Sequence, residues 1–256
     1  MLLALDVGNT NVTIGVFEGN RLIEHRRLRT VRDQTSDEWG ILMRNLFAVS
    51  KVEISQISGI IVASVVPPVN SQLAEMADRY FSTKAYFVNH ETNTGMPIRY
   101  DSPQEVGADR LVNGVAAFHR YGGPCVVVDL GTAITFDAIS AQGEYLGGVI
   151  AAGIGISVEA LFAKTARLPF VAFETPSAVI GTNTVASMQS GLYFGALGAI
   201  DGIVERLHAE LGPHTKTIAT GGQASLIAPA SRYLRIVDEN LTLDGLQLIW
   251  ERIQSR

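Results

Sequence analysis

"LALDVGNTNVTIGVF", from Leu3 to Phe17, is the stretch of sequence that decides the fold. An apolar run ends at Asp6, a glycine and the polar residues Asn-Thr-Asn follow, and a second alternation of apolar residues then begins. This pattern predicts two strands joined by a tight turn, because apolar alternation indicates half-buried strands and Gly and Asn favour turns. The turn would then present a carboxylate, a glycine and small polar side chains at one edge of a sheet.

The same pattern occurs a second time. "VVVDLGTAITFDAI" begins at Val126, and its Asp129 corresponds to Asp6. Each copy continues through a glycine turn, near Gly19 and near Gly143, into a predicted third strand. Self-similarity of this kind indicates a duplicated structural unit. We therefore expect two halves of one architecture, each carrying its own polar turn.

The remaining segments complete these halves. The spacing of apolar residues predicts a helix over residues 36–50, with Ser36 as its N-cap. Buried strands are predicted over 59–66, 85–89 and 216–222, and further helices over 68–81, 154–165, 184–211 and 241–253. The expected fold class is α/β, with two mixed-sheet lobes at residues 1–115 and 116–256 joined by a helix near 106–120.

Composition narrows the class of protein. The chain has 256 residues, 47% of them hydrophobic, and a net charge of −5. These values fit a globular protein with a large core and give no broad basic surface, so we expect no nucleic-acid partner. Cys125 is the only cysteine, and no apolar stretch is long enough to span a bilayer. With no signal peptide evident, we expect a cytoplasmic protein and no membrane partner.

The repeated turns suit phosphate binding. A carboxylate at the end of a strand can hold a hydrated Mg²⁺, and a following glycine lets a ligand approach the backbone closely. Successive N–H groups in such a turn, with the side chains of Asn9, Thr10 and Asn11, form a concave anion site. One turn alone could be an ordinary hairpin. Two equivalent turns in a duplicated chain favour a nucleotide polyphosphate held in a cleft between the lobes.

A second motif is "GADR", from Gly107 to Arg110. Arg110 near a helix N-terminus suits an anionic substrate group, and Asp109 could accept a proton from a substrate hydroxyl. The alternative is that Asp109 only complements the helix dipole and pairs with Arg110. Next to two phosphate turns, we favour the catalytic interpretation.

The duplicated arrangement resembles the actin, Hsp70 and sugar-kinase superfamily, in which each lobe carries a ribonuclease-H-like sheet. More specifically, "DVGNTN", "GADR" and "DLGTA" occur in the order and spacing typical of type III pantothenate kinases. This resemblance covers essentially the whole chain. It implies ATP-dependent phosphorylation of pantothenate to 4′-phosphopantothenate, the first step of coenzyme A biosynthesis, by a homodimer that uses Mg²⁺ and a monovalent cation, K⁺ or NH₄⁺.

The resemblance also implies roles for individual residues. Asp109 would be the catalytic proton acceptor, Asp6 would face Mg²⁺, and Asp129 would bind the monovalent cation. The implied ATP contacts are Asp6, Val7, Gly8, Asn9, Thr10, Asn11, Val12, Thr13 and Thr132, and the implied pantothenate contacts are Tyr100, Gly107, Ala108, Asp109, Arg110 and Thr184.

Other functions remain as alternatives. One is a non-enzymatic regulator on the same scaffold, although such a protein has no need of three clustered carboxylates. Another is an actin- or Hsp70-like ATPase, for which the chain is short, and the nearest enzyme alternative is a kinase for another small molecule. The basic run "EHRRLRTVR" at residues 24–32 is expected to be a solvated strand edge without a function.

Overall fold

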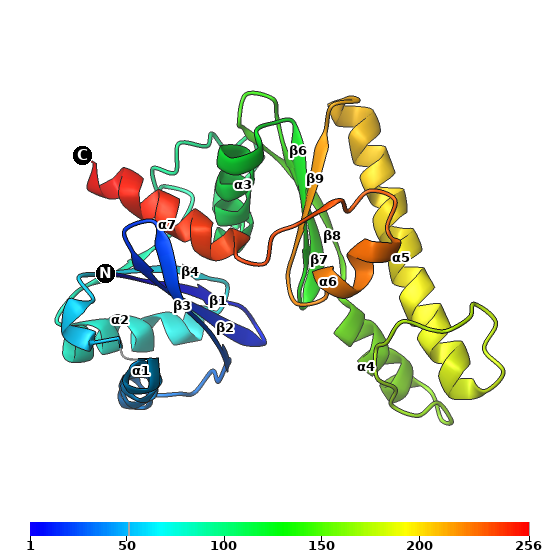
Figure 1. Ribbon diagram of the computed structural model, residues 1–256, viewed down its shortest axis with the longest axis horizontal. Helices are drawn as coiled ribbons and strands as arrows, with labels where there is room; N and C mark the ends of the chain where they lie inside the picture. Colours follow the sequence, from blue (N-terminus) through cyan, green and yellow to red (C-terminus); the bar gives the residue numbers. More distant parts are fainter. Residues whose placement is uncertain (51, 256) are drawn as a thin grey trace. The chain divides into compact units, whose positions relative to one another are not determined.

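The computed structural model describes residues 1–50 and 52–255. The chain forms two compact units, each with its own five-stranded sheet in the described part (Figure 1). Unit 1 comprises Met1–Met96, Asp101–Ala116 and Thr242–Arg256, and unit 2 comprises Pro97–Tyr100 and Ala117–Leu241. The C-terminal helix therefore belongs with the first unit, although it follows the second in sequence.

The sheet of unit 1 is mixed, with the strand order β3-β2-β1-β4-β5. β1, β2 and β3 are antiparallel neighbours, whereas β4 runs parallel to β1 and β5 parallel to β4. Asp6 lies near the carboxyl end of β1, opposite Thr13 of β2 on one side and Ala63 of β4 on the other. The strands are β1 (Leu2–Val7), β2 (Asn11–Glu18), β3 (Arg21–Arg29), β4 (Gly59–Ser64) and β5 (Ala85–Phe87).

β2 and β3 form a hairpin whose register shifts between Val16 and Phe17. Phe17 lies opposite Leu22, but Val16 lies opposite Glu24, so Ile23 is an extra residue on β3. Such a β-bulge changes which side chains of the longer strand face each side of the sheet. Beyond the bulge, towards the turn after Asp6, Thr13 pairs with Arg27.

Helices cover both faces of this sheet. One apolar cluster joins α1 and α2 to alternate β1 residues such as Leu3 and Leu5, and another joins α3 and α7 to Leu2 and Ala4. The alternation arises because successive side chains of a strand project to opposite faces. The helices are α1 (Ser36–Ser50), α2 (Pro67–Phe81), α3 (Ala108–Tyr121) and α7 (Leu241–Gln254), with short 3₁₀ turns η1 (Ile54–Gln56) and η2 (Pro103–Glu105).

The start of α1 differs from the sequence-based expectation. Ser36 is the first helical residue, and the cap is Thr35. The Thr35 hydroxyl accepts a bond from the Glu38 backbone N–H at 3.3 Å, and the Glu38 carboxylate accepts one from the Thr35 N–H at 2.8 Å. These reciprocal bonds form a capping box, which needs Thr and Glu three residues apart. Ser36 has no residue of that kind three positions further on, so the expected N-cap was wrong by one residue.

Unit 2 repeats the pattern, with the strand order β10-β9-β6-β7-β8. β6, β7 and β8 are antiparallel neighbours and β9 is parallel to β6, matching β1, β2, β3 and β4 of unit 1. The duplicated α/β architecture predicted from the two polar turns is therefore confirmed. The strands are β6 (Cys125–Leu130), β7 (Ala133–Ile139), β8 (Tyr145–Ala152), β9 (Lys216–Thr220) and β10 (Ile236–Val237).

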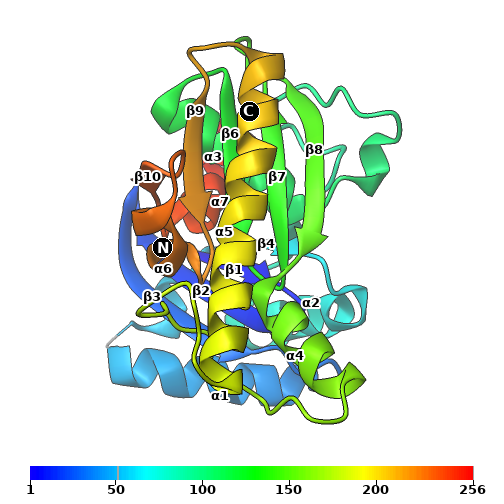
Figure 2. The same cartoon turned by 90° about the vertical axis from the view of Figure 1, so that its right-hand side faces the viewer.

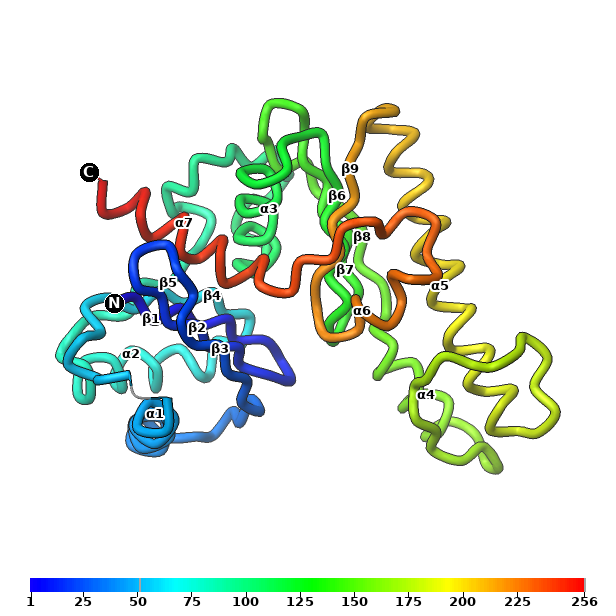
Figure 3. Tube along the Cα trace, viewed as in Figure 1, coloured from blue at the N-terminus to red at the C-terminus, as the bar shows by residue number. Residues whose placement is uncertain are grey.

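One face of this second sheet is covered by the long helix α5, which lies in front of the strands in Figure 2. Val126, Val128 and Leu130 of β6 face α5 in a single apolar cluster. Residues 165–183 connect α4 to α5 without a helix or strand (Figure 3). None of the helices in the described part of the chain has the length and apolar content to cross a bilayer. The helices of unit 2 are α4 (Ile154–Lys164), α5 (Thr184–Leu211) and α6 (Ala224–Ile227), followed by the 3₁₀ turn η3 (Ala228–Ala230).

Candidate functional site

The turn after β1 is narrow because Gly8 lies against Asn11. The Gly8 N–H donates to the Asn11 carbonyl oxygen at 3.0 Å, and a Cβ on Gly8 would lie 3.2 Å from that oxygen. Asn9, Thr10 and Asn11 are exposed at the tip. The turn therefore presents accessible polar groups at the carboxyl edge of the sheet, next to the half-buried Asp6.

The segment following β3 fixes this turn. The Thr30 N–H donates to the Thr10 carbonyl at 2.9 Å, and the Thr30 hydroxyl donates to the Gly8 carbonyl at 2.6 Å. Arg32 Nη2 donates to Asn9 Oδ1 at 3.2 Å. These contacts occupy carbonyl oxygens of the turn from outside and hold its backbone in one conformation. Sequence reasoning missed Thr30 and Arg32, because no local pattern reports a contact that depends on the third strand.

Asp6 and Asp109 belong to the same side of the unit 1 sheet. Ala4 lies two residues before Asp6 on β1, and Ala63 of β4 lies opposite Asp6, so both project to the same side as Asp6. Both alanines lie in one apolar cluster with Ala108. The N-terminus of α3 is therefore packed against the face from which Asp6 projects. The structure thus places two of the carboxylates that the sequence singled out on one side of the unit 1 sheet.

Asp109 is held in a fixed orientation. Its Oδ1 accepts a bond from the Arg110 N–H at 2.8 Å, and a Cβ on Gly107 would lie 2.5 Å from the same oxygen. Burial raises the pKa of the Asp109 carboxyl, and this effect outweighs the bond and the positive charge from Arg110, which lower it. A carboxylate with a raised pKa is a stronger base, as general-base catalysis requires. Gly107 provides the space that this carboxylate occupies.

The second turn, in unit 2, occupies the equivalent place between β6 and β7 but is one residue shorter than the first. Asp129 lies near the carboxyl end of β6, opposite Thr135 of β7 and Thr220 of β9. The Gly131 N–H donates to the Ala133 carbonyl at 3.1 Å, with Thr132 between them. The register places three oxygen-bearing side chains in one row across neighbouring strands.

Tyr100 lies on the same face of this sheet as Asp129. Its ring centroid is 6.4 Å from that of Tyr145, whose hydroxyl donates to Asp137 at 2.8 Å. Asp137 is fully buried and also accepts a bond from the Thr135 hydroxyl at 3.3 Å. Sequence reasoning missed Asp137, although "TFD" places it two residues after Thr135 and hence on the same face.

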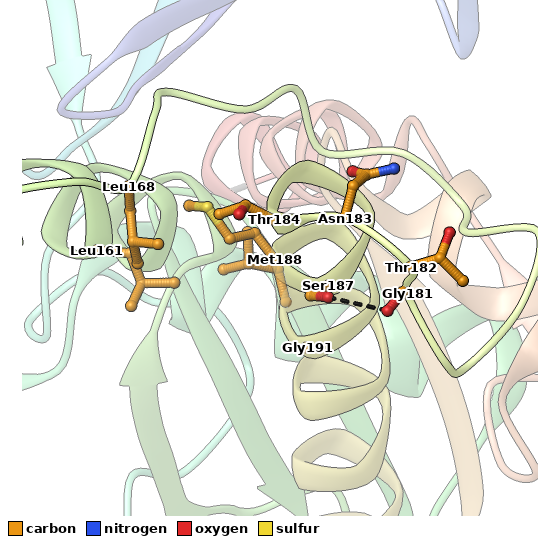
Figure 4. Close-up of a pocket in the computed structure, with 10 residues that line it drawn as sticks. Leu161, Leu168, Gly181, Thr182, Asn183, Thr184, Ser187, Met188 and Gly191 are labelled. Carbon is orange, nitrogen blue, oxygen red and sulfur yellow. Dashed lines mark hydrogen bonds between the residues drawn. The ribbon is translucent and has the colours of Figure 1, made fainter.

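Thr184 begins α5, so it lies on the opposite side of the sheet from Tyr100. The side chain of Asn183 caps the helix by accepting a bond from the Ala186 N–H at 2.9 Å. Thr184 lines a pocket of about 680 Å³ between α4, α5 and their connection, shown in Figure 4 with the bond from the Ser187 hydroxyl to the Gly181 carbonyl. Unit 2 by itself therefore does not bring Thr184 and Tyr100 together.

The donor set fits a divalent cation bound with a nucleotide. In the described ranges, no three His, Cys, Asp or Glu side chains gather into a metal cage. Mg²⁺ rarely needs one, because it is usually held by one or two carboxylates, water and the phosphates of the substrate. Asp6, at a strand end beside the exposed turn, is a donor of this kind.

Comparison with known proteins identifies a family for this chain. A family model described as type III pantothenate kinase matches residues 2–206. Among relatives, the type III pantothenate kinase of Solibacter usitatus (strain Ellin6076) is 67% identical, over 98% of this chain and 97% of that protein. The type III pantothenate kinase of Koribacter versatilis (strain Ellin345) is 58% identical, over 100% and 97%.

The fold also matches solved structures. An inorganic polyphosphate/ATP-glucomannokinase from Arthrobacter sp. strain KM superimposes with a TM-score of 0.51 at 12% identity, over 100% of this chain and 99% of that chain. At this identity the likeness concerns the fold alone, and it supports the predicted actin-like sugar-kinase architecture. The high identity of the sequence relatives over nearly their full length gives the narrower assignment: the chain belongs to the type III pantothenate kinase family.

Proposed function

We propose that this protein phosphorylates pantothenate with ATP to give 4′-phosphopantothenate, the first step of coenzyme A biosynthesis. The observation that carries the proposal is the match to type III pantothenate kinases across nearly the whole chain. The packing of α3 against the Asp6 face supports it, because a kinase needs a proton acceptor beside its phosphate site.

Asp109 is the proposed base. Its carboxylate takes the proton of the pantothenate hydroxyl as that oxygen forms a bond to the γ-phosphorus, and the bond from this phosphorus to the ADP leaving oxygen breaks. The raised pKa of Asp109 makes its carboxylate a stronger proton acceptor. Arg110 suits the pantothenate carboxylate through its planar fork of donors. Gly107, Ala108, Tyr100 and Thr184 complete the proposed pantothenate contacts.

The turn residues 6–13 are the proposed phosphate site, with Asp6 oriented towards Mg²⁺ and Thr132 as a further ATP contact. When bound, Mg²⁺ neutralises negative charge on the phosphates. We assign Asp129 to the monovalent cation, K⁺ or NH₄⁺, which would reduce repulsion between carboxylates and phosphates. The oxygen-bearing row around Asp129 supports this assignment. Since ATP and pantothenate are both soluble metabolites, we place the activity in the cytoplasm.

A homodimer is proposed because unit 2 exposes many large apolar side chains. Contiguous exposed apolar area commonly marks an interface between proteins. A second copy could also supply Thr184 to a pocket that one unit 2 does not complete. The exposed large apolar residues between positions 146 and 185 are Leu146, Ile150, Ile156, Leu161, Phe162, Phe170, Val179, Ile180 and Val185.

Light scattering tests the homodimer. Ile180→Asp, at a side chain that is 83% exposed, should reduce the mass of the particle by half and lower pantothenate turnover. Val49→Asp is the control, because Val49 is 82% exposed but lies on α1 in unit 1. A wild-type protein with the mass of one chain would contradict the proposal.

The activity is tested by coupling ADP release to a spectroscopic signal, with ATP, Mg²⁺, K⁺ and pantothenate. Turnover should require pantothenate, fall sharply when Na⁺ replaces K⁺ at constant ionic strength, and nearly vanish in Asp109→Asn. Asp101→Asn is the control, because it removes an exposed carboxylate eight residues earlier in the sequence. Phosphorylation of another alcohol in place of pantothenate would reassign the substrate, and full activity in Asp109→Asn would remove the proposed base.

A further inference from the structure

The arginines of the basic run at residues 24–32 are divided between the two faces of the sheet in a regular way. Most of the run lies in β3, the strand at one edge of the unit 1 sheet, and the bulge at Ile23 determines which of its residues share a face. Beyond the bulge, Arg27 lies opposite Thr13, and Thr13 lies opposite Asp6. Residues opposite one another in register project from the same face. Arg27 therefore lies in one row with Asp6.

Arg29 occupies the equivalent position one row further along. It lies opposite Asn11, the last residue of the turn after β1. Neighbouring strands are about 4.8 Å apart, so the backbone of Arg27 and Arg29 lies about 4.8 Å from β2 and about twice that distance from β1. Both long side chains can therefore reach the edge of the sheet at which the turn presents its polar groups.

This part of the sheet face is open. α7 packs over the sheet at Gly15, where an added Cβ would lie 3.0 Å from Leu243 Cδ1. Beyond that point, Asn11, Arg27 and Arg29 are exposed. Within the described residues, the side chains of Arg27 and Arg29 make no hydrogen bond or ion pair. Two guanidinium groups that are unpaired within the described residues thus lie on the strand next to the turn.

Arg26 shows what the same residue type does on the other face. It forms an ion pair with Glu24 at 2.9 Å and donates a hydrogen bond to the Ser50 hydroxyl at 3.4 Å. Beyond the bulge, the strand therefore separates its three arginines into one that is paired on the other face and two on the Asp6 side.

We propose that Arg27 and Arg29 bind the polyphosphate of ATP at the turn formed by residues 8–11, an inference that rests on the proposed kinase function. A phosphate site beside Asp6 needs positive charge, and no lysine occurs in the first fifty residues. Arginine meets this need because its fork of donors matches phosphate oxygens, often with two parallel bonds. Arg32 serves differently, since it is bonded to Asn9 and positions the turn.

The test compares two double variants of the full-length protein that lose equal charge. Arg27→Gln/Arg29→Gln removes the proposed contacts, whereas Arg21→Gln/Arg26→Gln removes two arginines of the same strand that are paired with Glu18 and Glu24. Calorimetry measures the binding of ADP and of inorganic tripolyphosphate to each protein. We expect binding to weaken about 10-fold per arginine in the first variant, since hydrogen bonds to charged groups contribute on that scale. The second variant should bind as the wild type does.

Equal binding by all three proteins would overturn the inference, and so would equal weakening in both variants, which would indicate bulk charge. Steady-state kinetics give a second readout: KM for ATP should rise in Arg27→Gln/Arg29→Gln while KM for pantothenate stays unchanged. A third outcome, in which the wild type binds neither ADP nor tripolyphosphate, would count against the proposed kinase function itself. That result would remove the inference together with the function on which it rests.

Discussion

Gly221 is the position at which a single methyl group would test the second turn most directly. It follows β9 with φ of +89°, a conformation that residues other than glycine adopt only with strain. A Cβ there would clash with Asp129 Oδ1 and lie 2.7 Å from the backbone nitrogen of Leu130. Gly221→Ala therefore combines backbone strain with displacement of the proposed cation ligand.

Gly122 provides the matched control. Its φ is +72°, and an added Cβ would have nothing within 4 Å. Gly122→Ala thus carries strain alone, about 1–2 kcal/mol of unfolding free energy. Forcing extra atoms into a packed site costs a further 1–3 kcal/mol, roughly, so Gly221→Ala should lose about 2–5 kcal/mol in total. Urea titration at constant pH and salt measures both values.

The functional part of the prediction concerns the cation. Because the clash involves Asp129, the K⁺ concentration for half-maximal activity should rise about 10-fold in Gly221→Ala, a free-energy change of roughly 1.4 kcal/mol. It should stay unchanged in Gly122→Ala. If both variants lost equal stability and kept the K⁺ response of the wild type, the proposed contact between Gly221 and Asp129 would be refuted.

Three further predictions follow from single residues. Burial raises the folded-state pKa of Asp109, so the stability that comes from protonating this carboxyl is lost as pH rises through that pKa. Asp109→Asn should therefore need more urea to unfold at pH 8, although it loses turnover. An unchanged urea midpoint would contradict this. Burial raises the pKa of Cys125 to about 12, so a thiol reagent at pH 8 should label it only in unfolded protein. Thr35→Ala should cost about 0.5–2 kcal/mol of unfolding free energy by urea titration, and Ser36→Ala clearly less, because only Thr35 caps α1 with Glu38.

The fold could be predicted from the sequence where the signals are local. The alternation of apolar residues around Asp6 and Asp129 identified both hairpins, because each hairpin is formed by two strands that follow one another in sequence across a short turn. The predicted starts of two helices, at residues 106 and 184, also lie close to the observed starts at Ala108 and Thr184. The cap of α1 was missed by one residue because Thr35 and Ser36 both fit the composition of an N-cap, and only the partner Glu38 distinguishes them.

The surroundings of the turn could not be predicted in the same way. The contacts of Thr30 with Gly8 and Thr10 join segments about twenty residues apart in sequence. Similarly, the buried bond between Asp137 and Tyr145 depends on the register of β7 with β8. Such contacts follow from strand pairing, which the composition of either strand alone does not specify.

The extra residue at Ile23 has a consequence for how this strand can vary. Without it, an unbroken ladder would place Arg26 opposite Thr13 and Arg27 opposite Val12, because shifting the register by one residue moves every side chain to the other side. Insertion or deletion of one amino acid between the hairpin loop and Arg26 would therefore move Arg26 to the Asp6 side of the sheet and Arg27 and Arg29 to the other side, even if all residue types were kept. The spacing of this strand, as much as its charge, decides which guanidinium groups a nucleotide could meet.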